Sequence, residues 1–106
     1  MTDSLADLAQ RLQRFAQERD WQPFHSPKNL ASALIVEAGE LLEHFQWLTE
    51  DQSRQLAPAE RAAVAAEMAD VLLYLLQLSS AMGVDLIAAA QAKIEANALK
   101  YPAARG

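Results

Sequence analysis

Apolar residues recur every three or four positions along four segments of the chain, a spacing typical of amphipathic helices. The predicted helices run from about Asp3 to Arg19, from Pro27 to Trp47 or Leu48, from Pro58 to about Met82, and from Leu86 to about Lys100. Residues that favour helix ends stand at the boundaries: Thr2, Asp3 or Ser4, Ser26, Thr49 before a short polar turn, Gly83 and Asp85. With short connections between the helices, the pattern predicts an all-α fold, a four-helix bundle formed by a single domain over residues 1–106.

Two segments depart from a simple amphipathic pattern. The second half of the third helix is apolar on nearly every face, which indicates a central helix or one covered by a second subunit. The loop over residues 21–27 holds Trp21, Phe24, His25 and two prolines. Aromatic residues in a loop on a rigid scaffold often form a binding wall. The alternative is that Trp21 and Phe24 close the end of the bundle, and the sequence favours neither.

Two acidic pairs, Glu37 with Glu40 and Glu67 with Asp70, interrupt the apolar helices. Residues three apart on a helix project in nearly the same direction, about 4.5 Å apart along the axis. Glu37 and Glu67 each fall on an apolar row, where a carboxylate is seldom buried unless it is paired or binds a cation. Carboxylates gathered where two helices meet therefore predict a divalent-metal site.

The ligand types rank the metals. Carboxylate oxygens suit Mg²⁺, and Mn²⁺ accepts the same set. Zinc is disfavoured because the chain has no cysteine and only two histidines. Di-iron bundles use Glu-x-x-His, and Leu41 stands where that motif would need an acid before His44. The alternative is that the acids are solvated helix-face charges. Glu43 follows Glu40 by three residues. The sequence leaves three roles open for it: a further metal ligand, a group that supports the ligands, or a surface acid.

A basic and polar row lies on the last predicted helix. Its members, spaced i, i+4, i+7 and i+8 on one face, are Lys93, Asn97, Lys100 and Tyr101. Ammonium, amide and phenol groups suit phosphate oxygens. Lysines near a helix C-terminus also complement the helix dipole, which is the alternative explanation. Beside a metal site, the row predicts a polyphosphate ligand with metal on one side and lysines on the other.

Aromatic side chains that could stack on a nucleobase lie at three places. They are Trp21, Phe24 and His25 in the first loop, Phe45 and Trp47 at the end of the second helix, and Tyr74 one turn after Asp70. An ordinary core or interface position also accounts for Phe45 and Phe24.

Composition narrows the function classes. The formal net charge of −5 argues against binding of a nucleic-acid polymer or a membrane surface, but permits a phosphorylated ligand if metal ions intervene. Without cysteine there is neither a disulfide framework nor a thiolate metal site. The start of the chain lacks a signal-peptide pattern, and charged or polar residues interrupt the long apolar runs. We therefore expect a cytoplasmic protein.

Several motifs occur in a fixed order along nearly the whole chain. They are Phe15–Trp21 (FAQERDW), Phe24–Leu30 (FHSPKNL), Glu37–Leu41 (EAGEL), Phe45–Trp47 (FQW), Glu67–Tyr74 (EMADVLLY), Lys93–Asn97 (KIEAN) and Lys100–Pro102 (KYP). This ordered set resembles the MazG-like all-α nucleotide pyrophosphohydrolases, and within them the short dCTP pyrophosphatase group.

The resemblance implies a Mg²⁺-dependent enzyme that cleaves a nucleoside triphosphate between its α and β phosphates, releasing a nucleoside monophosphate and pyrophosphate. Its substrate would be dCTP or a related or modified deoxynucleotide, and its role control of the nucleotide pool. It also implies a homodimer or homotetramer with sites at the subunit interfaces. The residue roles it implies are metal ligation by Glu37, Glu40, Glu67 and Asp70, phosphate and sugar contacts by Lys93, Asn97 and Tyr101, and a nucleoside pocket of Trp21, Trp47 and Tyr74. We also predict that Glu37 or Glu40 accepts a proton from the attacking water, and that Lys100 and Tyr74 join the phosphate and sugar contacts.

One position departs from the resemblance. Some eukaryotic members carry a histidine on the first helix that reaches the base, and this chain has Leu12 there. Cytosine selectivity is therefore open, with His25 or the loop backbone as alternative polar contacts. Two other function classes also fit parts of the sequence. One is a non-catalytic helical dimer or adaptor that binds a nucleotide, and the other is a carboxylate-bundle redox protein, which the missing Glu-x-x-His disfavours.

Overall fold

The computed structural model describes residues 4–104, which form helices and no strand. The elements are α1 (Leu5–Glu18), the 3₁₀ helix η1 (Gln22–Phe24), α2 (Pro27–Glu43), α3 (Glu50–Ser53), α4 (Pro58–Met82) and α5 (Leu86–Lys100). The all-α prediction is confirmed, and α1, α4 and α5 have nearly the predicted bounds. Two of the three cap candidates for α1, Thr2 and Asp3, lie outside the described residues.

The predicted capping residues explain where the helices begin. Ser4, Ser26, Thr49 and Asp85 each accept a hydrogen bond from the backbone N–H three residues later. Thr49 also forms a reciprocal capping box, in which its own N–H donates to the Gln52 side chain. Local hydrogen bonding therefore accounts for the start of α1, α2, α3 and α5 without tertiary contacts.

The helix α2 ends at Glu43, before the predicted end at Trp47 or Leu48. The N–H groups of His44 and Phe45 donate to the carbonyls of Leu41 and Leu42, three residues back instead of four. This tighter bonding turns residues 44–47 out of the α-helix. The apolar spacing continues through these turns, which is why the pattern alone predicted a longer helix.

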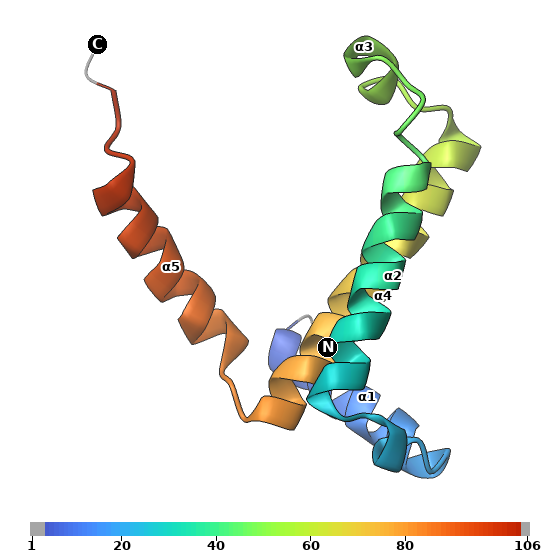
Figure 1. Cartoon of the computed structure of the whole chain (residues 1–106), viewed down its shortest axis with the longest axis vertical. Coiled ribbons are helices and arrows are strands. Elements are labelled where there is room, and N and C mark those ends of the chain that lie inside the picture. The colour runs from blue at the N-terminus through green and yellow to red at the C-terminus, as the bar shows by residue number, and fades with distance from the viewer. Residues whose placement is uncertain (1–3, 105–106) are drawn as a thin grey trace.

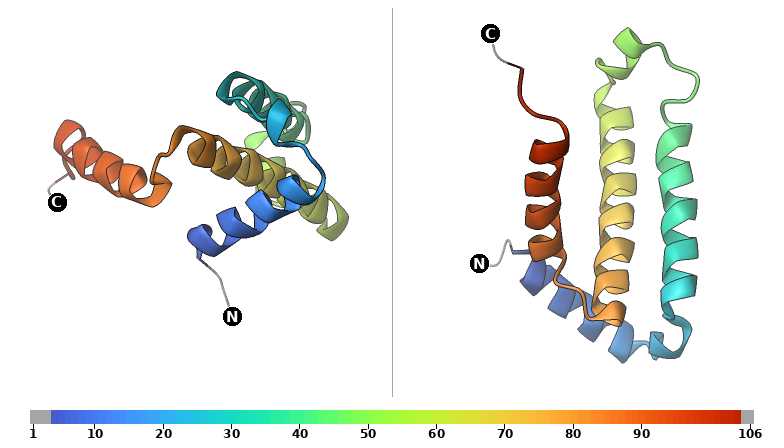
Figure 2. Two further views of the ribbon diagram at one scale, coloured as in Figure 1. Left: turned by 90° about the horizontal axis from the view of Figure 1, so that it is seen from below. Right: turned by 60° about the vertical axis from the view of Figure 1, so that its left-hand side comes forward.

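The antiparallel pair of α2 and α4 forms the body of the molecule, and α1 crosses the C-terminal half of α4 (Figures 1 and 2). Ala16, Leu30, Val64 and Leu76 are the fully buried apolar residues among those described. They come from α1, α2 and both halves of α4. The core therefore follows the α2–α4 contact and continues under α1.

The helix α5 does not pack against the other helices along its length. It leans away from the α2–α4 pair in Figure 1, and its ribbon stands apart from that pair in both views of Figure 2. Every residue from Ile87 to Tyr101 is exposed, including the apolar side chains of Ile94 (68%) and Leu99 (86%). All four main helices of the predicted bundle are present, but within one copy only α1, α2 and α4 pack together.

The single chain exposes more surface than a compact protein of its size. Its accessible area is 8433 Å², whereas a monomer of 11.6 kDa is expected to expose about 5,800 Å². Its radius of gyration is 16.9 Å, against about 13 Å for a compact domain of this length. The isolated copy therefore leaves apolar helix surface without a partner.

By length and composition, α4 is long and apolar enough to cross a membrane. This corrects the expectation from the sequence that charged or polar residues interrupt every apolar run before it reaches that length. The helix nevertheless packs along α2 and contacts α1. It also carries Glu67 and Asp70 in its middle. These contacts are those of the central helix of a bundle, for which a largely apolar surface serves packing against other helices.

Gly83 closes α4 in the left-handed conformation, with a φ of 66°. We expect Gly83→Ala to lower the free energy of unfolding by about 1–2 kcal/mol, because a Cβ atom disfavours this conformation. Gly39→Ala is the matched control, since a Cβ there meets no atom within 4 Å in the middle of α2. It should raise the free energy of unfolding by about 0.5–1 kcal/mol. Urea unfolding at equal protein concentration measures both, and effects of the same sign would contradict this account.

Candidate metal and nucleotide site

Three carboxylates meet where α2 faces α4: those of Glu37, Glu67 and Asp70. One oxygen of each lies within 4.8 Å of the other two. Glu67 and Asp70 come from successive turns of α4, and Glu37 from the α2 turn that faces them. Antiparallel packing of the two helices therefore brings together three of the four acids that the sequence singled out.

The charge of this cluster is not balanced by neighbouring protein groups. Oε2 of Glu37 and Oε2 of Glu67 are buried and have no hydrogen-bond partner among residues 4–104. Within the same residues, the salt bridges join Arg54 to Glu50 and Asp51 at the far end of the molecule. Buried carboxylate oxygens without partners are costly unless a cation satisfies them. The cluster, which offers only oxygen ligands, therefore fits a divalent metal ion.

The carboxyl group of Glu37 is the most perturbed of the cluster. Its pKa rises from 4.5 to about 7. The largest cause is a side-chain hydrogen bond with Glu40, which requires a proton on one of the two groups. Desolvation comes next, followed by repulsion from the charges of Glu40, Asp70 and Glu67. In the absence of a cation, this site therefore holds a proton near neutral pH.

The two remaining acids of α2 take different positions. Glu40, one turn after Glu37, is half-buried and acts on the Glu37 carboxyl group, although it is not one of the three acids whose oxygens lie within 4.8 Å. Glu43 is exposed at the last position of α2 and is outside the cluster. The geometry makes Glu40 a neighbour of the cluster and Glu43 a surface acid in this copy.

An aromatic cleft opens beside the acidic cluster. Asp70 belongs to the cluster and also lines the cleft. The other residues that line the cleft are Leu12, Phe15, Trp21, His25, Leu73, Tyr74 and Gln77. The rings of Phe15 and Trp21 meet edge to face at 5.5 Å, and those of Trp21 and His25 at 6.4 Å. The loop aromatic Trp21 thus forms a wall of a cleft that contains a candidate metal ligand.

The local backbone explains how the loop reaches this position. Asp20 adopts a φ of 54° after α1, which turns the chain sharply toward η1. The Asn29 side chain then donates a hydrogen bond to the Phe24 carbonyl and ties η1 to the first turn of α2. Phe24 itself points into solvent, with 69% of its surface exposed. Trp21 therefore lines the cleft, where a binding wall would lie, whereas Phe24 neither lines the cleft nor closes the bundle.

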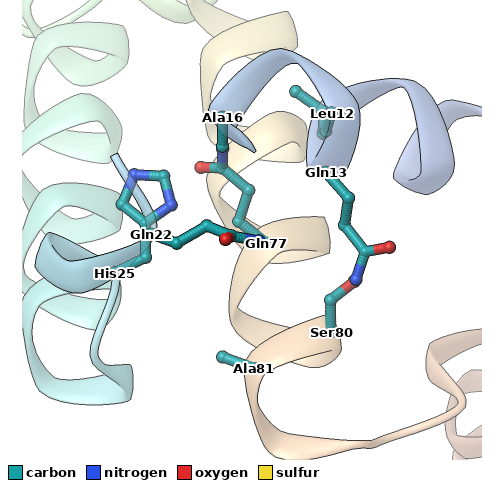
Figure 3. A pocket seen from close by; sticks show the side chains of 8 residues that line it. All are labelled: Leu12, Gln13, Ala16, Gln22, His25, Gln77, Ser80 and Ala81. Atoms are coloured by element: carbon teal, nitrogen blue, oxygen red, sulfur yellow. The ribbon is translucent and has the colours of Figure 1, made fainter. Parts of the chain in front are cut away.

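A second cavity adjoins the cleft. His25, Leu12 and Gln77 line both spaces, and Figure 3 shows the side chains of Gln22, His25 and Gln77 converging in the second one. Gln13 and Ser80 lie on its opposite side. The aromatic cleft therefore has apolar walls, a carboxylate at one end and amide and imidazole groups at the other.

The remaining predicted site residues lie away from this cleft. Trp47 follows the end of α2 and is 87% exposed. The basic row, which consists of Lys93, Asn97, Lys100 and Tyr101, is exposed on α5 and at its C-terminal end. Since α5 leans away from α2 and α4 (Figure 1), a single copy does not bring the basic row to the acidic cluster. The sequence prediction placed them in one site, and the turn at residues 83–85 separates them within one copy.

Three further residues line the aromatic cleft but were not predicted from the sequence: Phe15, Leu73 and Gln77. The first two are part of the apolar stripes of α1 and α4, so nothing in the pattern distinguishes them from core residues. Gln77 carried a usable signal, because Asp70, Tyr74 and Gln77 are spaced i, i+4 and i+7 and therefore share one face of α4.

The chain is similar in sequence to known proteins. The MazG-like family model matches residues 33–106. dCTP pyrophosphatase 1 of Homo sapiens is 44% identical over 102 residues, which cover 94% of this chain and 60% of the relative. The Mus musculus protein of the same name is 45% identical over 101 residues, covering 93% and 59%. The chain thus spans about three fifths of the length of these curated relatives.

A solved structure supports the fold. The crystal structure of a pyrophosphatase from Archaeoglobus fulgidus superposes with a TM-score of 0.89 at 36% sequence identity, covering 97% of this chain and 96% of the other. The likeness therefore includes all the helices described here, with the acidic pairs of α2 and α4 inside the region that the family model matches. The chain belongs to the MazG-like family.

Proposed function

We propose that this protein is a metal-dependent nucleoside triphosphate pyrophosphohydrolase that acts on dCTP or a closely related deoxynucleotide. The observation that carries the proposal is the shared position of Asp70, which belongs to the acidic cluster and also lines the aromatic cleft. A metal held by the cluster would lie beside a space suited to a stacked base. Two of the relatives are named dCTP pyrophosphatase 1, and the structural neighbour is named a pyrophosphatase.

The proposed cofactor is Mg²⁺, with Mn²⁺ as a substitute. Glu37, Glu67 and Asp70 would hold it, and Glu40 is the nearest additional carboxylate. A divalent ion bound there would neutralise phosphate charge and favour ionisation of water. The two buried oxygens of Glu37 and Glu67 without hydrogen bonds support this assignment.

The proposed proton acceptor is the Glu37–Glu40 pair. Glu40 lies one turn after the candidate ligand Glu37, so a second carboxylate stands beside the metal ligands, where it would reach a water bound there. One member of the pair would take a proton from the attacking water, and the α–β bond of the triphosphate would break to give a nucleoside monophosphate and pyrophosphate. A base of this kind contributes about 10²–10⁴-fold to the rate.

We further propose that the working unit is a homo-oligomer in which α5 of one copy serves the cluster of another. The exposed area of the single chain exceeds that of a compact monomer by about 2,600 Å², which is enough for an obligate interface. Ile87, Ile94 and Leu99 supply exposed apolar surface on α5, the same helix that carries the basic row. Docking α5 on a second copy would bury these side chains and bring Lys93 and Asn97 to phosphate.

The activity prediction concerns pyrophosphate release from dCTP. We expect release in the presence of Mg²⁺ and none in EDTA, and a loss of at least about 100-fold on Glu67→Gln, because the variant removes a charged metal ligand. Glu60→Gln, the same substitution at an exposed position of the same helix, should retain full activity. Metal-independent release, or equal rates for the two variants, would exclude the proposed enzyme.

We expect the stability of the metal-free protein to depend on pH, because protonation of Glu37 relieves repulsion in the cluster. Its stabilising contribution is therefore complete below the ordinary pKa of 4.5 and is lost as the pH rises to about 7. In EDTA, the thermal midpoint should fall over this range in wild type, and Glu37→Gln, which resembles the protonated acid, should flatten the fall. Added Mg²⁺ should reverse it above pH 7. An unchanged profile in Glu37→Gln would contradict the assignment.

The interface prediction uses complementation between two impaired variants. If the cluster and the basic row come from different copies, a mixed dimer of Glu67→Gln with Lys93→Glu contains one intact site. Random pairing of equal amounts should then restore about a quarter of wild-type activity. Mixing each variant with itself is the control. Recovery no greater than the sum of the separate variants would show that both residues act within one copy.

A further inference from the structure

One face of α4 carries three chemically different side chains in line: Asp70, Tyr74 and Gln77. All three line the aromatic cleft. Asp70 and Gln77 are seven residue steps apart, which is about 10 Å along the helix axis. Starting at the candidate metal ligand, this row presents in turn a carboxylate, an aromatic ring and an amide. A nucleotide bound along this row with its phosphates at the metal site would place its sugar near Tyr74 and the far edge of its base near Gln77.

Beyond Tyr74, the polar side chains that line the cleft itself are those of Gln77 and His25. Leu12 and Phe15 of α1 and Leu73 of α4 are apolar. The Trp21 and His25 rings pack against each other in the loop. Gln77 extends from α4 into the space shown in Figure 3, and among residues 4–104 it is the one amide that lines both the cleft and the second cavity.

The Gln77 amide has its hydrogen-bonding capacity available. No hydrogen bond to its side chain occurs among residues 4–104, where the side-chain bonds formed by other polar residues are mostly local caps. A primary amide presents one acceptor and two donors. It can accept from the amino group of cytosine while donating to ring N3, or, turned over, donate to O4 of uracil while accepting from N3–H. Because no neighbour holds the amide in one orientation, both arrangements are available to it.

His25 is the other polar side chain at this end, but its position suits a different task. It follows η1 in the loop and its ring meets Trp21 edge to face. Gln77 lies on the same helix face as Asp70, so its distance from the metal site is set by helix geometry. The fixed spacing makes Gln77 the group whose reach is matched to the length of a bound nucleoside.

We propose that Gln77 contacts the hydrogen-bonding edge of the base and, because its amide can turn over, that the site accepts uracil as well as cytosine deoxynucleotides. The proposal rests on the proposed hydrolysis of deoxynucleoside triphosphates. It assigns a specificity residue to that reaction and replaces the expected selectivity for cytosine with acceptance of both pyrimidine edge patterns.

The test compares Gln77→Leu with wild type on three substrates: dCTP, dUTP and 2-deoxyribose 5-triphosphate, which has no base. We expect wild type to differ by less than about tenfold in kcat/KM between dCTP and dUTP, since one amide pair serves each. Gln77→Leu should lower both values by about 10- to 100-fold, the range for a lost bidentate base contact. Hydrolysis of the base-free triphosphate should not change. Gln13→Leu, which alters the second cavity but not the cleft, is the matched control and should leave all three unchanged.

Three results would overturn the assignment: unchanged hydrolysis of both nucleotides by Gln77→Leu, an equal loss on the base-free substrate, or a strong wild-type preference for dCTP over dUTP. Calorimetry with the non-hydrolysable α,β-methylene analogues of dCTP and dUTP separates this proposal from the proposed activity. If wild type hydrolyses none of the substrates, the activity fails, while weaker binding of both analogues to Gln77→Leu would still support base contact. Equal binding to the two proteins would exclude it.

Discussion

The packing of α2 against α4 must accommodate the electrostatic repulsion among Glu37, Glu67 and Asp70. Apolar packing drives these helices together, and in doing so brings three like charges within 4.8 Å and buries two of their oxygens. Without a cation, the fold relieves the repulsion by holding a proton on Glu37. A divalent ion would relieve it more completely, because it satisfies all three carboxylates at once. Helix packing and ion binding are thus coupled through the same three side chains.

The same pair of helices also positions the cleft. Because α1 and the loop after it pack on the half of α4 that follows Asp70, the aromatic walls adjoin the charged cluster at a fixed distance. The cleft is formed by one face of α4 together with α1 and the loop that follows it, which the turn at Asp20 directs toward α4. Because α4 carries two of the proposed ligands, Glu67 and Asp70, and also the proposed base contact, it would hold the phosphate chain and the base at a constant separation.

Local signals in the sequence predicted the helices and the acidic pairs well. Ser26, Thr49 and Asp85 cap as expected, and Glu37, Glu67 and Asp70 meet because two apolar rows, each interrupted by an acid, must face each other. Two features could not be predicted this way. The end of α2 depends on a change from i−4 to i−3 hydrogen bonds, which apolar spacing does not record. The direction of α5 follows from the short turn at residues 83–85, which apolar spacing does not record, so the basic row was predicted to lie nearer the acids than it does in a single chain.

The most direct test of this account is to locate Mn²⁺ by anomalous diffraction in crystals grown with the ion. The account predicts a single strong peak bound by carboxylate oxygens of Glu37, Glu67 and Asp70, at about 2.2 Å as for hard-ligand sites. A peak confined to other acids, such as Glu50 and Asp51 on α3, or no peak at the cluster at saturating Mn²⁺, would contradict the central claim that these three carboxylates form a metal site.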